Sequence, residues 1–191
     1  DIPILVVTAF SLDEQEILSD FYAKAFGPAG PAVRRFQERL QEAWTAATAG
    51  GQDVSCQSIE TTRVLELFTP ELLGSCAEAL AQAAKMAGGD VIRRRVEFLR
   101  QGLRYTEVTV DAVRYVKAVD LRADAAPTVA ARTEQKARVQ AAIQAIERRR
   151  QLVEENRDGF VLPYFWARYS DEQRSSFLPL ARLRTLAQTL H

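Results

Sequence analysis

The stretch that decides the fold covers residues 90–113 and reads DVIRRRVEFLRQGLRYTEVTVDAV. An apolar residue or a threonine recurs at every third or fourth position, in the order Ile92, Val96, Leu99, Leu103, Thr106, Val110 and Val113. This spacing is typical of a helix with one face packed on neighbouring helices. Asp90 is expected to cap the helix, and Gly102 to permit a close approach or a slight bend. The stretch therefore predicts one long amphipathic helix.

Turn residues divide the preceding part of the chain into further helices. Ser11-Leu12-Asp13-Glu14 is a capping box, which predicts a helix that runs to about Phe26 and ends at Gly27-Pro28. Pro31 is placed to open the next helix, which is expected to end at Gly50-Gly51. The apolar stripe of that helix consists of Val33, Phe36, Leu40, Ala43, Trp44 and Ala47.

A shorter segment over residues 58–68 leads to Thr69-Pro70, an N-cap followed by proline. The helix that it opens is Ala-rich, covers residues 72–87 and is expected to end at Gly88-Gly89.

The remainder of the chain repeats this pattern. Pro127 marks a break, and Thr128 is expected to cap a helix that reaches about Asn156 and ends by Gly159. The stripe of this helix is Val139, Ile143, Ile146 and Val153, and residues 148–150 form a basic turn that suits the C-terminal end of a helix dipole. Ser170 begins a second capping box, which predicts one or two short helices through Leu190.

Together these patterns predict an all-α fold, an antiparallel bundle of five or more helices forming a single domain over residues 1–191. Residues 2–7 form a short strand-like segment interrupted by Pro3, so residues 1–10 are interpreted as an edge strand or the tail of a preceding domain. Met86 is the only methionine, which favours a fragment of a larger multidomain protein.

Composition argues against several classes of function. Lys plus Arg and Asp plus Glu are balanced at 25 each, so no overall positive field draws the chain to nucleic acid. No apolar run is long enough for a membrane span. Cys56 and Cys76 are interpreted as two small, partly buried thiols, with a disulfide as the alternative.

The sequence shows no pattern of residues that is typical of a common catalytic centre. The single histidine, His191, is the last residue, which argues against nucleophilic triads and histidine metal sites. The paired glycines lack the setting of a phosphate-binding loop, and the acids Asp13, Glu14 and Glu16 match the first turn of a helix. We therefore expect no catalytic residue, no metal and no cofactor in this chain.

Two other clusters allow a binding role. Tyr164, Trp166 and Tyr169, together with Phe165, form an aromatic loop that either covers one end of the bundle or stacks on a sugar ring or partner surface. Residues 93–95 are three consecutive arginines, interpreted as a solvated face or a salt-bridged seam.

Three segments carry a resemblance to a known family. The run DFYAKAFGPA over residues 20–29 resembles the Tyr…Phe-Gly-Pro-Ala segment that follows the barrel in bacterial glycoside-hydrolase-like proteins with a DUF4838 domain. A helix containing Val33, Arg35, Phe36 and Leu40 follows, as it does in that family. The run RRVEFLRQGLRY over residues 94–105 resembles that family's Arg-Val-Glu helix, and similar regions occur in α-glucuronidase-like glycosidases.

The resemblance covers residues 10–120 and implies a helical accessory domain of an exported, polysaccharide-active enzyme. In such proteins the barrel holds the catalytic carboxylates, and this chain has no βα repeat from which to build one. The expected partners are therefore the preceding catalytic domain and carbohydrate. This interpretation predicts an exposed apolar patch. The alternative is a stand-alone helical module that binds a protein partner, and an enzyme relying on carboxylates alone is a third, weaker hypothesis.

Overall fold

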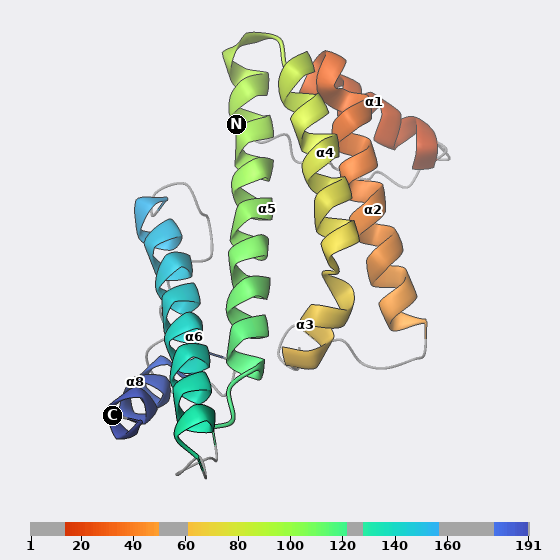
Figure 1. The fold of residues 1–191 in the computed structure, drawn as a ribbon. Helices are drawn as coiled ribbons and strands as arrows, with labels where there is room; N and C mark the ends of the chain where they lie inside the picture. Colours follow the sequence, from red (N-terminus) through yellow and green to blue (C-terminus); the bar gives the residue numbers. More distant parts are fainter. Residues whose placement is uncertain (1–13, 50–60, 122–127, 157–177, 191) are drawn as a thin grey trace. The chain divides into compact units, whose positions relative to one another are not determined.

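The computed structural model describes residues 14–49, 61–121, 128–156 and 178–190, and every secondary-structure element in these ranges is helical. In chain order the elements are α1 (Glu14–Phe26), η1 (Gly27–Ala29), α2 (Gly30–Thr48), α3 (Thr61–Leu67), α4 (Pro70–Met86), α5 (Gly89–Lys117), α6 (Val129–Glu155) and α8 (Leu180–Thr189) (Figure 1). The prediction of an all-α bundle is therefore confirmed. The strand-like segment over residues 2–7 lies outside the described residues.

The chain divides into two compact units. Among the described residues, the first unit contains α1, η1, α2, α4 and the part of α5 up to Leu103. The second contains α3, the part of α5 from Arg104, α6 and α8. The expectation of a single domain stays a prediction.

In the first unit, α2 and α4 run antiparallel and in contact along their lengths (Figure 1). Small residues line the buried face of α4, where Cys76, Ala79 and Ala83 lie at helical spacing. Such a face lets α2 approach closely, and Arg35 Nη2 joins the two helices at the surface by donating to Gln82 Oε1 over 2.7 Å. The α2 stripe is buried at Val33 and Phe36. Trp44 is 42% exposed, since the buried residues of α2 all lie in its first half.

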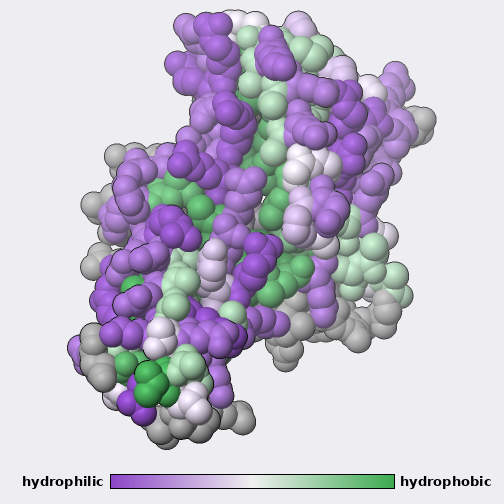
Figure 2. All heavy atoms as spheres, in the orientation of Figure 1, coloured by the Kyte–Doolittle hydropathy of each residue, from purple (hydrophilic) through white to green (hydrophobic). Residues whose placement is uncertain are grey.

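The first part of α5 completes this unit. Val96 of α5 shares one buried cluster with Ala83 of α4 and with Phe26 and Ala29. Hydrophobic residues appear as a strip between α4 and α5, flanked by hydrophilic ones (Figure 2). The helix begins at Gly89, whose φ of +75° is the left-handed conformation that glycine adopts without strain. Asp90 therefore lies inside the first turn and is not the N-cap, which corrects the sequence prediction.

In the second unit, α6 packs on α8 and is joined to α5 by side-chain hydrogen bonds. The predicted α6 stripe is buried at Val139, Ile146 and Val153, and Leu183 is fully buried on α8. Two polar links join the helices to the segment after α5: Gln135 Nε2 donates to Asp120 O over 2.8 Å, and Arg182 Nη2 donates to Leu121 O over 2.9 Å.

Two predicted helix caps are confirmed in detail. The Thr69 hydroxyl accepts a hydrogen bond from the Leu72 N–H at 3.2 Å, and the Thr128 hydroxyl accepts one from the Ala131 N–H at 3.1 Å. Each satisfies a first-turn N–H that has no partner within the helix. The helix capped by Thr128 ends at Glu155, a few residues before Gly159, which lies outside the described residues.

Candidate functional site

An open apolar groove in the first unit is the strongest candidate for a binding site. It has a volume of about 540 Å³ and is formed by α1, α2 and the first turns of α5. The aromatic residues that line it are Phe21, Tyr22, Phe26 and Phe98, and the aliphatic ones are Ala25, Val33, Val91 and Leu99. Apolar pockets of this volume with a few polar groups are characteristic of binding sites.

The α1 wall of the groove is a packed aromatic cluster. The ring centroids of Phe21 and Tyr22 lie 5.4 Å apart with their planes at 69°, and those of Phe21 and Phe26 lie 6.3 Å apart at 78°. These edge-to-face arrangements are the favoured geometry for aromatic pairs. Because the rings hold one another in place, the wall presents a fixed surface to an occupant.

Two glycines set the position of this wall. Gly27 has a φ of +51°, and a Cβ atom there would lie 3.1 Å from Ile92 Cδ1. At Gly30 a Cβ atom would lie 2.7 Å from the carbonyl oxygen of Tyr22, closer than real Cβ contacts come. Gly30 thus allows α2 to touch the backbone of α1 at Tyr22, which places the aromatic wall beside the groove.

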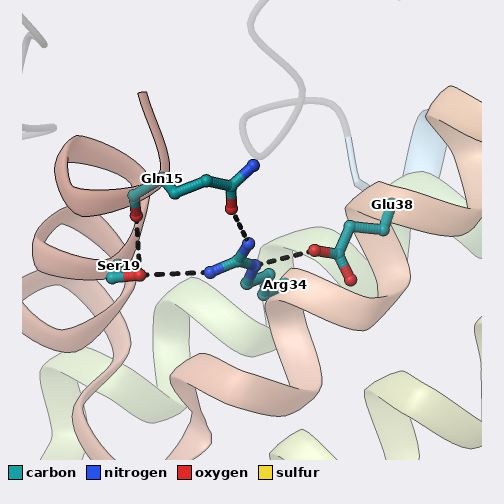
Figure 3. A network of polar contacts seen from close by, with 4 residues as sticks. All are labelled: Gln15, Ser19, Arg34 and Glu38. Atoms are coloured by element: carbon teal, nitrogen blue, oxygen red, sulfur yellow. Dashed lines mark hydrogen bonds and ion pairs between the residues drawn. The ribbon is translucent and has the colours of Figure 1, made fainter. Parts of the chain in front are cut away.

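A polar network on the outer surface joins the same two helices (Figure 3). Arg34 of α2 donates to Glu38 Oε1 over 2.7 Å, to the Ser19 hydroxyl over 3.1 Å and to the side-chain oxygen of Gln15. The Ser19 hydroxyl in turn donates to the Gln15 carbonyl over 2.7 Å. Partial burial, followed by the negative charge of Glu38, raises the pKa of Tyr22, while Arg34 opposes this shift. The network fixes α1 against α2 but does not line the groove.

The α5 wall of the groove differs from the α1 wall because two of its apolar side chains remain exposed to solvent. Val91 is 51% exposed and Phe98 is 49% exposed. The two residues stand two turns apart, which places them on one face of α5. Sequence reasoning assigned the apolar stripe of α5 to residues such as Ile92 and Leu99 and missed this second apolar edge. The spacing of apolar residues within one helix does not show which of its faces other helices will cover.

The polar groups that line the groove are Gln37, Arg94 and Arg95, and no carboxylate is among the lining residues that the structure describes. Arg95 Nη1 donates to the carbonyl oxygen of Ala25 over 2.8 Å, at the last turn of α1. A cation there complements the negative end of the helix dipole. The solvated-face interpretation of the three arginines thus holds for the exposed Arg93 and Arg94, while Arg95 is half-buried and joins two helices.

Arg149 is a second feature that sequence reasoning missed. It belongs to the predicted basic turn of α6, yet it is only 3% exposed. Its Nε donates to the Thr109 hydroxyl over 3.0 Å, its Nη2 donates to the Tyr105 hydroxyl over 2.6 Å, and its Cζ lies 5.1 Å from the centroid of the Tyr105 ring. These contacts stabilise a buried cation within the second unit.

Gly102 does not serve the close approach between helices that the sequence suggested. A Cβ atom added at this position would have no neighbouring atom within 4 Å.

The described residues offer little for catalysis. They contain no group of three or more His, Cys, Asp or Glu residues that could hold a metal ion. Cys76 is a buried free thiol whose pKa is raised by burial. The pKa of Glu107 is raised by burial and by the charge of Asp111, but both carboxylates lie on one face of α5 and not across a cleft.

Several predicted residues are not tested. Tyr164, Trp166 and Tyr169 lie outside the described residues, as does Cys56. Within the described ranges, no helix is both long enough and apolar enough to cross a bilayer. No protein-family model, curated protein or solved structure matches the chain.

Proposed function

We propose that this chain is a non-catalytic helical module that docks onto an apolar surface of a protein partner through the groove of the first unit. The observation that carries the proposal is the α5 wall, where Val91 and Phe98 remain about half exposed beside a fixed aromatic wall. Complete burial of such side chains is worth about 1.5–3 kcal/mol each. Covering the exposed halves would therefore contribute about 1 kcal/mol per residue.

The form of the groove favours a protein segment as the occupant. Grooves between helices commonly receive an amphipathic helix through anchors at helical spacing. Here Val91 and Phe98 offer two contact points on one side, two helical turns apart, and the aromatic wall of α1 faces the same space. This geometry suits an elongated apolar segment.

We further propose that the partner is the catalytic barrel of an exported bacterial glycoside-hydrolase-like protein, as the DUF4838 resemblance implies. Residues from all three segments that carry the resemblance meet in the first unit. Phe26 and Ala29 share a buried cluster with Val96, and Arg95 bonds to Ala25. A domain shared with that family would require these segments to form one core. Under this proposal the barrel supplies the chemistry, and this module stabilises or extends its cleft.

Site-specific photocrosslinking in the producing cell tests both parts of the proposal. A photoreactive phenylalanine analogue replaces Phe98, and the same analogue at Val129, which is 80% exposed on α6, is the control. We expect crosslinks from position 98, but not from position 129, to a glycoside-hydrolase-like barrel, within the same polypeptide or in a complex. A position-specific crosslink to another class of protein would overturn the glycosidase assignment and favour a stand-alone interaction module. Equal or absent crosslinking at the two positions would overturn docking through the groove.

A further inference from the structure

The charge beside the exposed apolar edge identifies the chemistry of the partner. Arg94 lies between Val91 and Phe98 in sequence, three residues after one and four before the other, so all three share one face of α5. It is exposed and lines the groove. Any segment that covers the two apolar residues therefore also meets this guanidinium group.

The neighbouring arginines have partners within the fold. Arg93 pairs with Asp90 at 2.5 Å, Arg95 bonds to Ala25, and Arg100 pairs with Glu97 at 3.0 Å. Arg94, by contrast, makes no ion pair or hydrogen bond through its side chain to any residue in the described ranges.

We infer that the partner segment carries a carboxylate that pairs with Arg94 between two apolar anchors, one beside Val91 and one beside Phe98. This inference rests on the proposed function. The groove holds two guanidinium groups and, among its described lining residues, no acid, so an approaching carboxylate meets attraction without a competing internal partner. A basic segment would meet repulsion from both arginines. The occupant is therefore an acidic amphipathic segment of a protein.

A peptide-display selection tests the inference directly, because it requires no partner isolated from cells. Random peptides of about 16 residues, long enough for about four helical turns, are selected on the folded chain and counter-selected on the Phe98→Asp variant. We expect the recovered peptides to combine Leu or Phe at helical spacing with an adjacent Asp or Glu. Their affinity is expected to fall at least about tenfold in Phe98→Asp, because an apolar anchor is lost and a charge is placed in the groove. Trp44→Asp, an exposed aromatic outside the groove, is the matched control and is expected to leave affinity unchanged.

The role of Arg94 is tested by exchanging charges. Arg94→Glu is expected to weaken binding of the selected peptides by about tenfold, and replacing the peptide carboxylate with lysine is expected to restore binding to that variant. Arg93→Glu makes the same change of charge one residue away, at a side chain that does not line the groove. It is expected to change affinity clearly less than Arg94→Glu does, because the Arg93 side chain pairs with Asp90 and does not line the groove. Far-UV circular dichroism checks that each variant is folded.

The outcomes separate the two proposals. If Phe98-dependent peptides are recovered but carry no acidic residue, or bind equally to Arg94→Glu and Arg93→Glu, the carboxylate inference is overturned and docking through the groove stands. If the selection yields no peptide that depends on Phe98, the proposed docking function fails and the inference fails with it.

Discussion

Replacing Gly30 with alanine tests whether the close contact between α1 and α2 holds the aromatic wall in place. A methyl group at this position would lie 2.7 Å from the carbonyl oxygen and 3.0 Å from the carbonyl carbon of Tyr22. These are backbone atoms of α1, so the clash is relieved only if one helix moves away from the other. Forcing extra atoms into a packed contact costs about 1–3 kcal/mol.

An opposing effect has to be subtracted from this cost. Gly30 lies in α2 with helical angles, φ −48° and ψ −51°, and alanine is favoured over glycine in helices by up to about 1 kcal/mol. Subtracting about 1 kcal/mol leaves an expected net loss of about 0–2 kcal/mol in the free energy of unfolding. For a chain of this length, that corresponds to a decrease in Tm of at most about 8 °C.

Gly102→Ala is the matched control, because a methyl group at that helical position would meet nothing within 4 Å. It is expected to stabilise the protein by about 0.5–1 kcal/mol. Urea unfolding followed by the fluorescence of Trp44 reports on the first unit when Trp166 is replaced by Phe, since the chain has 2 tryptophans. If the Gly30→Ala and Gly102→Ala variants shift the midpoint in the same direction, the close-contact argument is refuted.

Three further predictions concern other parts of the fold. Arg149→Leu is expected to destabilise the second unit by about 2–3 kcal/mol, measured by urea unfolding, because the Tyr105 hydroxyl loses its charged partner; no loss would contradict the role of the buried cation. Thr69→Ala and Thr128→Ala are each expected to cost about 1 kcal/mol in the same assay, with serine at either position restoring most of it. The pKa of Glu107 is raised in the folded state, so the folded protein holds this proton more tightly than the unfolded chain does. The free energy of unfolding therefore decreases as pH rises through and above the ordinary pKa of a glutamate. Glu107→Gln is therefore expected to raise Tm slightly at pH 7 but not at pH 3; an equal gain at both values would exclude the charge as the cause.

The helices could be predicted from sequence because their signals are local. Thr69 and Thr128 each act on an N–H three residues further along, and the α5 stripe repeats within a single helix. Gly102 and Gly30 show where such reasoning fails. Both are glycines within helical segments, but whether another backbone lies beside a glycine depends on how the helices pack. Sequence reasoning assigned either a close approach or a slight bend to Gly102, and the structure places the close approach at Gly30.

The groove lay beyond sequence reasoning for the same physical reason. Phe98 and Leu99 are adjacent apolar residues, and the periodicity of α5 accounts for Leu99 alone. Phe98 can be recognised as a candidate binding residue only from the structure, in which α1 lines the same groove but leaves Phe98 half exposed. Arg149 is a parallel case, because its burial depends on Tyr105 and Thr109, which stand on another helix.

These contrasts separate residues that build the fold from those available for binding. In the Phe-Gly-Pro-Ala segment, Phe26 and Ala29 are buried and Gly27 has a positive φ, so each is accounted for by packing or backbone geometry. Such a segment can mark a shared fold without marking a shared ligand. Phe98 and Arg94 have no comparable role in the fold, since one is half exposed and the other forms no ion pair with the described residues. Changes at these two positions are therefore expected to alter binding while leaving stability nearly unchanged. Changes in the segment over residues 26–30 are expected to lower stability and, because Phe26 lines the groove and Gly30 positions its aromatic wall, to alter binding as well.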